Sequence, residues 1–236
     1  MKKKSPFLIL FIIPLFSALA QDKVVVKITN EGDANQLLSS SRFLFSQFED
    51  ARVYIRGSNI NTKMNYNLLM DRMQFIDENG DTLIMTDNKA VTVVMFGKRP
   101  FKYSPKGFVE VLVVDSPNST ELSIKRSIKL IDRKKTGPYG IKLNSSSVND
   151  LYSTGQDAGE GLYKIATTAE ELSFIRKNIF YLSTNDKYTV ANRKGFMKTY
   201  AKQKNEITDY LKRFPVDFEK EEDIARLFDF CKKASL

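Results

Sequence analysis

The sequence contains no histidine, no tryptophan and a single cysteine, Cys231. The absence of histidine excludes any mechanism that needs an imidazole base and any metal site that needs imidazole ligands. One thiol forms neither an internal disulfide nor a Cys–His zinc site nor an iron–sulfur site. The lack of tryptophan weakens the case for a carbohydrate-stacking surface. We therefore predict no cofactor, no metal and no catalytic residue.

The remaining composition is that of an ordinary folding chain. Hydrophobic residues make up 42% of the 236 residues and charged residues 28%, which argues against a disordered or membrane-embedded chain. Lysine and arginine outnumber aspartate and glutamate by 37 to 28, a formal net charge of +9. This basicity suits an anionic surface or ligand, but it also serves solubility. We predict no nucleic-acid partner.

Residues 1–20 have the three parts of a secretory signal peptide. Lys2–Lys4 supply the basic start, Phe7–Leu19 the apolar run, and Ala18–Ala20 the small residues that a signal peptidase requires. The apolar run contains Pro14 and is shorter than the roughly twenty residues of a membrane span. We expect an exported protein that is periplasmic, outer-membrane associated or secreted, with no membrane span after cleavage. No cysteine begins the mature chain, so we do not expect a lipoprotein.

Residues 21–191 show the two-residue apolar period of β-strands. The alternation is clearest at Lys23–Thr29, Ala51–Ile55, Met64–Leu68 and Glu121–Arg133. Asn79-Gly80 lies between two apolar runs and predicts a hairpin. Val91–Phe96 and most of Phe108–Val114 are apolar on both faces, which predicts central strands covered on each side. Closely spaced strands with their own turns predict an antiparallel meander.

The period becomes helical from residue 192 onward. One apolar stripe runs from Phe196 to Phe214, with a break expected near Lys202–Lys204, and a second begins after the acidic Glu221–Asp223. We predict an α+β fold, in which an antiparallel β-meander (a twisted sheet, sandwich or partial barrel) carries two or three C-terminal helices. Residues 21–236 are then a single domain, β-rich over 21–191 and helical over 192–236. The long polar stretch Asn144–Gly161 leaves the alternative that the tail is a separate lobe.

Several strings, taken in order, resemble a group of exported proteins common in Bacteroidota. They are Lys63–Leu69, Met73–Ile76, Arg99–Phe101, Gly107–Leu112, Gly137–Gly140 and the helical tail from Arg193 through Ile207 and Tyr210. The resemblance spans most of the mature chain. It implies an envelope protein with a β-meander and a basic helical tail. The family has no assigned activity, so the resemblance implies no catalytic residue.

Glu110 is an acid inside the apolar run Phe108–Val114, where a carboxylate has a raised pKa or a basic partner. Arg126 is its natural counterpart, because it lies between Ile124 and Ile128 on the inward face of a predicted strand. Three interpretations are open. A bulge turns Arg126 into solvent, or Arg126 stays inside and forms a structural ion pair with an acid, or the pair faces a ligand.

Arg193, Lys194 and Lys198 crowd the start of a predicted helix, the unfavourable end for cations. A bound anion such as a lipid phosphate would relieve this repulsion, whereas solvated charges at an exposed helix end need no ligand. These three residues are therefore candidates for an anion site, as Glu110 and Arg126 are for a ligand site.

The sequence favours a non-enzymatic exported protein of the cell envelope. We expect it to bind a hydrophobic or anionic envelope component, such as a lipid, or a protein partner. A first alternative is a hydrolase that uses carboxylates alone, with Glu110 as one of two acids facing a cleft. A second is a structural adaptor on an outer-membrane complex, which predicts an exposed apolar patch in place of a pocket.

Overall fold

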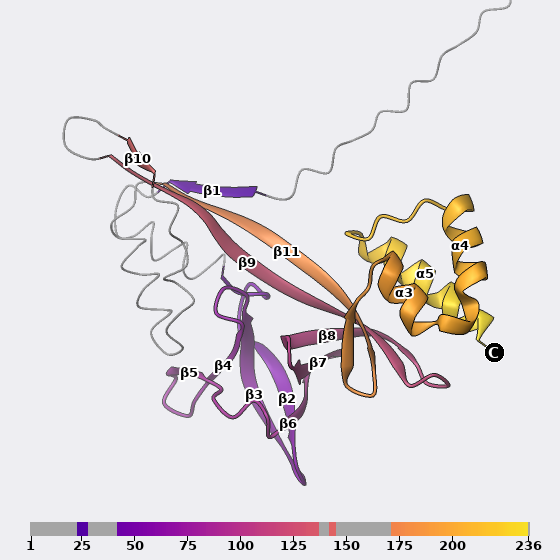
Figure 1. The fold of residues 1–236 in the computed structure, drawn as a ribbon. Coiled ribbons are helices and arrows are strands. Elements are labelled where there is room, and N and C mark those ends of the chain that lie inside the picture. The colour runs from indigo at the N-terminus through magenta and orange to yellow at the C-terminus, as the bar shows by residue number, and fades with distance from the viewer. Residues whose placement is uncertain (1–22, 28–41, 137–141, 145–170, 236) are drawn as a thin grey trace, which may run out of the picture.

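The computed structural model describes residues 23–27, 42–136, 142–144 and 171–235 (Figure 1). The predicted signal peptide and nearly all of the predicted loop Asn144–Gly161 lie outside these ranges.

A meander of antiparallel strands forms most of the described chain and confirms the predicted fold class. The first six strands are β1 (Lys23–Lys27), β2 (Glu49–Ile55), β3 (Ser58–Asn67), β4 (Arg72–Ile76), β5 (Thr82–Ile84) and β6 (Val91–Phe96). The next six are β7 (Arg99–Ser104), β8 (Gly107–Asp115), β9 (Thr120–Thr136), β10 (Lys142–Asn144), β11 (Glu171–Thr184) and β12 (Lys187–Val190). Their order in the sheet is β1-β11-β9-β8-β7-β6-β2-β3-β4-β5, with β10 beside β9 and β12 beside β11.

Short turns with left-handed residues join the strands. Gly80 has φ +87° in the β4–β5 turn, so the hairpin predicted at Asn79-Gly80 is confirmed. Asn185 and Asp186 both have positive φ, which is the requirement of a two-residue turn of type I′ between β11 and β12. Gly107 has φ +87° and lies so close to Asp71 that a side chain there would overlap the carboxylate.

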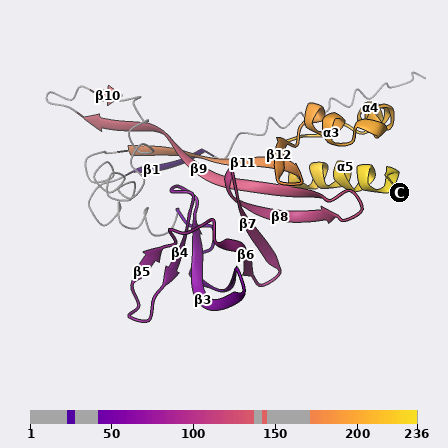
Figure 2. The same ribbon diagram turned by 60° about the horizontal axis from the view of Figure 1, so that its bottom comes forward.

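The long strands β9 and β11 form a twisted ribbon that connects two parts of the molecule. The curled strands β2–β7 lie along one stretch of this ribbon, and the helices lie at one of its ends (Figures 1 and 2). The sheet does not close, because the order ends at β1 on one side and at β5 on the other. A long ribbon with two covered stretches therefore organises the fold.

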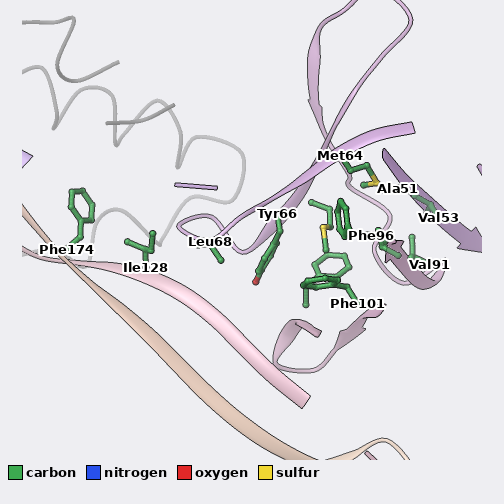
Figure 3. Close-up of a cluster of buried hydrophobic side chains, with 13 residues drawn as sticks. Ala51, Val53, Met64, Tyr66, Leu68, Val91, Phe96, Phe101, Ile128 and Phe174 are labelled. Carbon is green, nitrogen blue, oxygen red and sulfur yellow. The ribbon is translucent and has the colours of Figure 1, made fainter. Parts of the chain in front are cut away.

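The curled strands enclose a first hydrophobic core (Figure 3). Its fully buried members include Met64, Tyr66, Met73, Val94 and Phe108. Polar groups attach this core to the ribbon. The Tyr66 hydroxyl donates to Oδ1 of Asp71 at 2.5 Å, and Lys125 of β9 pairs with the same carboxylate. A backbone hydrogen bond also joins the turn after β3 to β9, since the Ile128 amide donates to the Leu68 carbonyl.

The C-terminal helices cover a second hydrophobic core on β8, β9 and β11. They are α3 (Arg193–Thr199), a short 3-10 turn η3 (Ala201–Gln203), α4 (Lys204–Arg213) and α5 (Glu221–Ala234). The break predicted near Lys202–Lys204 is confirmed by η3. Strand residues Leu122 and Leu182 pack in this core with Phe196 of α3 and with Leu227 and Phe228 of α5.

Candidate functional site

An apolar groove of about 410 Å³ opens at the end of the curled sheet. Its apolar lining comes from three strands and the segment after β5: Val53, Ile55, Ile60, Met64, Phe75, Ile76 and Met85. Val53 and Met64 also belong to the first core, so the groove is the open end of that core. A concave apolar site that continues a core is the usual form of a site for an apolar ligand.

The position where β4 leaves β3 creates the groove. β4 pairs with β3 only from Met64 to Asn67, whereas β3 begins six residues earlier at Ser58. Beyond Met64 the last link between the two strands is the Thr62 hydroxyl, which donates to the Ile76 carbonyl at 3.3 Å. The first part of the inward face of β3 is therefore left uncovered, and Ile60 is 52% exposed.

Acidic residues stand at the rim of the groove. Asp77 and Glu78 line it where β4 ends. The Asp77 carboxylate accepts hydrogen bonds from the amides of Asn79 at 3.0 Å and Asp81 at 2.7 Å, which shape the turn. Glu78 is exposed. The negative rim on a chain of net charge +9 disfavours an anionic ligand at this place.

A second, more polar groove of about 600 Å³ lies on the opposite face of the β2–β3 hairpin. Two of its charged side chains form an ion pair, and a third donates to a neutral amide. Lys63 pairs with Asp50 at 3.2 Å, and Nε of Arg52 donates to the Asn61 side chain at 3.0 Å. Tyr54 is half-buried in this groove. Because Lys63 and Asp50 are exposed and already paired, the polar groove offers less binding energy than the apolar one.

Glu110 lies at the centre of a group of ion pairs, with its side chain 7% exposed. Its two oxygens accept from Arg99 of β7 at 2.6 and 2.9 Å, a bidentate arrangement. Arg126 of β9 donates to the same carboxylate and, through Nη2, to Glu221 of α5 at 2.9 Å. The group therefore joins three strands of the sheet to the first turn of α5.

Arg126 separates the two hydrophobic cores. The register of β9 against β11 runs without a shift from Thr120 to Leu130, so the bulge considered at Arg126 is wrong. On one face of β9, Ile124 packs in the second core and Ile128 in the first. Arg126 stands between them with a 21% exposed side chain. Of the three sequence-based interpretations, the geometry is that of the inward ion pair.

The pairing favours the charged form of Arg99. The hydrogen bonds from Arg99 to Glu110 raise the pKa of this guanidinium above its ordinary value, although its partial burial acts the other way. Arg99 also lies over the ring of Phe45, 4.9 Å from the ring centroid. Each member thus has partners within the protein, and the arrangement is that of a structural clamp.

The other sequence-predicted candidates, Arg193, Lys194 and Lys198, lie on the surface of α3. The Asn192 side chain caps this helix by accepting a hydrogen bond from the Gly195 amide. Among the described residues, no hydrogen bond or ion pair joins the three cations to Glu110 or Arg126. The structure therefore separates the candidates into a buried group and an exposed group.

Sequence patterns alone did not reveal the apolar groove. Ile60 stands in the polar string Ser58–Thr62, where a single apolar residue carries little signal. The neighbouring Thr62 faces the same side, which a strand period of two does indicate. The sequence does not show where β4 leaves β3, because that point depends on how the two strands pair.

A buried polar cluster lies under the helices. Asp115 is fully buried and accepts from Asn118 at 2.9 Å and from the Tyr200 hydroxyl at 3.2 Å, while its Oδ1 has no partner in the described part of the chain. Burial, followed by the nearby Asp115, raises the pKa of Cys231 to about 12. The thiol is therefore protonated at neutral pH, which suits a packing role.

Within the described ranges, no helix has the length and apolar character needed to cross a membrane. The same residues contain no group of three or more side chains of the metal-binding types placed to hold an ion. No protein-family model, curated protein or solved structure matches the chain. The resemblance to exported Bacteroidota proteins stays a prediction from the sequence.

Proposed function

We propose that this protein is a non-enzymatic exported protein of the cell envelope that binds an apolar component, a lipid or a protein partner, in the apolar groove. The observation that carries the proposal is the exposure of apolar side chains, above all Ile60, where the groove continues the first core at the open end of the curled sheet. Covering such a surface removes apolar area from water, at about 25 cal/mol for each Å².

The geometry favours an apolar ligand over the other classes expected from the sequence. A groove of about 410 Å³ lies within the usual range for ligand sites. Its acidic rim opposes an anionic ligand. The candidate acid of a carboxylate-only hydrolase, Glu110, is held by two arginines and is almost inaccessible, so no observation favours hydrolysis.

The test compares two variants that add the same charge at apolar positions of similar exposure. Ile60→Asp places a carboxylate in the groove, and Val190→Asp places one on β12, where Val190 is 45% exposed. Each full-length protein is purified from its native envelope, and the co-purified lipids and proteins are quantified by mass spectrometry. Binding of the neutral apolar dye Nile red is measured in parallel.

We expect the wild-type protein and Val190→Asp to retain a co-purified component and to bind the dye. Ile60→Asp should lose both by about tenfold, because a carboxylate in the apolar groove must be desolvated on binding. Equal retention and equal dye binding by the two variants would contradict a role for the groove.

A further inference from the structure

Among the described residues, one edge of β3 has no neighbouring strand over half of its length. β2 pairs with β3 from Ser58 to Met64, and β4 occupies the other edge only from Met64 to Asn67. Among the described residues, nothing pairs with that other edge between Ser58 and Thr62. Five residues are the typical length of a β-strand, so a complete additional strand fits there.

Backbone polar groups point outward along this free edge. The β2–β3 hairpin closes at the pair Ile55–Ser58 after a two-residue turn, so the even-numbered peptide groups of β3 bond to β2. The alternate groups, those of Asn59 and Asn61, face the free edge. They offer amide donors and carbonyl acceptors that an added strand would satisfy.

The free edge and the apolar groove adjoin each other. Ile60 and Thr62 belong both to the free stretch of β3 and to the groove lining. A strand placed along this edge would direct every second side chain into the groove, since side chains alternate between the two faces of a sheet. Edge and groove together have the two parts of a peptide site that works by strand addition, in which the backbone gives affinity and the pocket gives specificity.

We propose that the occupant of the groove is an extended segment of a partner polypeptide that adds as a strand to the free edge of β3. The inference rests on the proposed function, because it uses the same groove. The segment has apolar residues at alternate positions, which fill the groove. It also carries a lysine or arginine near Asp77 and Glu78, whose negative charge complements it.

The edge of β5 is a poorer candidate for the same role. β5 has three residues, Thr82–Ile84, and very short edge strands resist the addition of a further strand. The free part of β3 is longer and lies directly beside a groove. These differences select the β3 edge.

The test uses a library of short random peptides displayed on phage and selected on the full-length protein. Asn61→Pro removes the amide hydrogen that faces the free edge, and proline is tolerated there because this amide bonds to none of the described strands. Asn61→Thr is the matched control: it also removes the side-chain bond to Arg52 but keeps the amide. Thermal unfolding of both variants checks their folding.

A second measurement does not depend on any variant. Selected peptides are synthesised with and without methyl groups on alternate backbone nitrogens. The side chains stay the same, and only the hydrogen bonds of an added strand are lost. Amide hydrogen exchange at Asn59 and Asn61 is recorded with and without the unmethylated peptide.

We expect the selected peptides to have alternating apolar residues and one basic residue. Asn61→Pro should weaken their binding about tenfold, and Asn61→Thr should leave their affinity unchanged. Methylation should abolish binding, and the peptide should protect both amides from exchange. Strand addition would be overturned if the peptides fail to bind Ile60→Asp but still bind Asn61→Pro, and if the methylated peptides still bind. The groove would then remain a binding site. Failure to select any peptide would overturn a polypeptide occupant, and dye binding then decides separately on the groove.

Discussion

Glu110 is the residue on which two arginines from different strands converge. Its side chain is 7% exposed, whereas those of Arg126 and Arg99 are 21% and 39% exposed. Neutralising the carboxylate leaves two guanidiniums facing each other with less water than they have in the unfolded chain. The cost of removing one partner of a buried pair is several kcal/mol, and the exposure of the arginines lowers it here.

We predict that Glu110→Gln lowers the free energy of unfolding by about 2 kcal/mol, measured by urea denaturation followed by circular dichroism. The control is Asp50→Asn, which breaks the exposed Lys63–Asp50 pair and should change stability by less than about 0.5 kcal/mol. Equal effects of the two substitutions would show that the clamp contributes no more than a surface ion pair.

The sequence indicated part of this clamp. Glu110 inside an apolar run and Arg126 on an inward position suggested an ion pair, because both residues interrupt apolar faces. Arg99 and Glu221 gave no such signal, since each stands in a polar neighbourhood of the sequence. They join the group because β7 lies beside β8 and because α5 begins above β9.

At the scale of elements, Gly195 fixes how α3 meets the sheet. A Cβ atom at this position would overlap the carbonyl oxygen of Val190, the last residue of β12. The helix therefore approaches the strand end closely enough to bury Phe196 completely in the second core. Backbone oxygen has no freedom to move aside without distorting the strand.

Gly195→Ala should destabilise the fold by about 2 kcal/mol, because relieving the overlap shifts α3 away from the sheet. The temperature of thermal unfolding measures the effect. Lys194→Ala, a substitution at the exposed neighbouring position, should leave that temperature nearly unchanged. A Gly195→Ala protein as stable as the Lys194→Ala protein would refute close packing at this contact.

The two strands predicted to be covered on both faces have different outcomes. β8 confirms the prediction, since Val109 and Val111 are buried on one face while Phe108 and Glu110 are buried on the other. For β6 the central position is confirmed, because β6 lies between β7 and β2, but the covering of both faces is wrong. Thr92 is exposed and the half-buried Met95 lines the polar groove. Apolar composition shows that a face tolerates burial, but only the neighbouring elements decide whether the face is covered.

At the scale of the whole molecule, the two hydrophobic cores share β9. Ile124 belongs to one core and Ile128 to the other, and Arg126 between them ties α5 to the sheet. Loss of either core would expose the ribbon side chains that it buries, such as Ile128 in the first core and Ile124 in the second. The single domain expected from the sequence stays a prediction, and the unfolding of the two cores tests it.

We predict that both cores unfold in one cooperative transition. Hydrogen exchange at increasing urea, read separately from peptides of β3 and of α5, should give the same midpoint. Two midpoints, with α5 opening first, would instead support the alternative of a separate C-terminal lobe.

The sequence by itself determined most of the strands, the tight turns between them, the break between α3 and α4 and the antiparallel meander. These features depend on local periodicity and on turn chemistry at residues such as Gly80 and Asn185, which act within a few positions of the chain. The tertiary structure alone decided the partners of Glu110, the apolar groove and the free edge of β3. Each of these depends on which strands meet and where one of them leaves its neighbour, and distant segments settle that together.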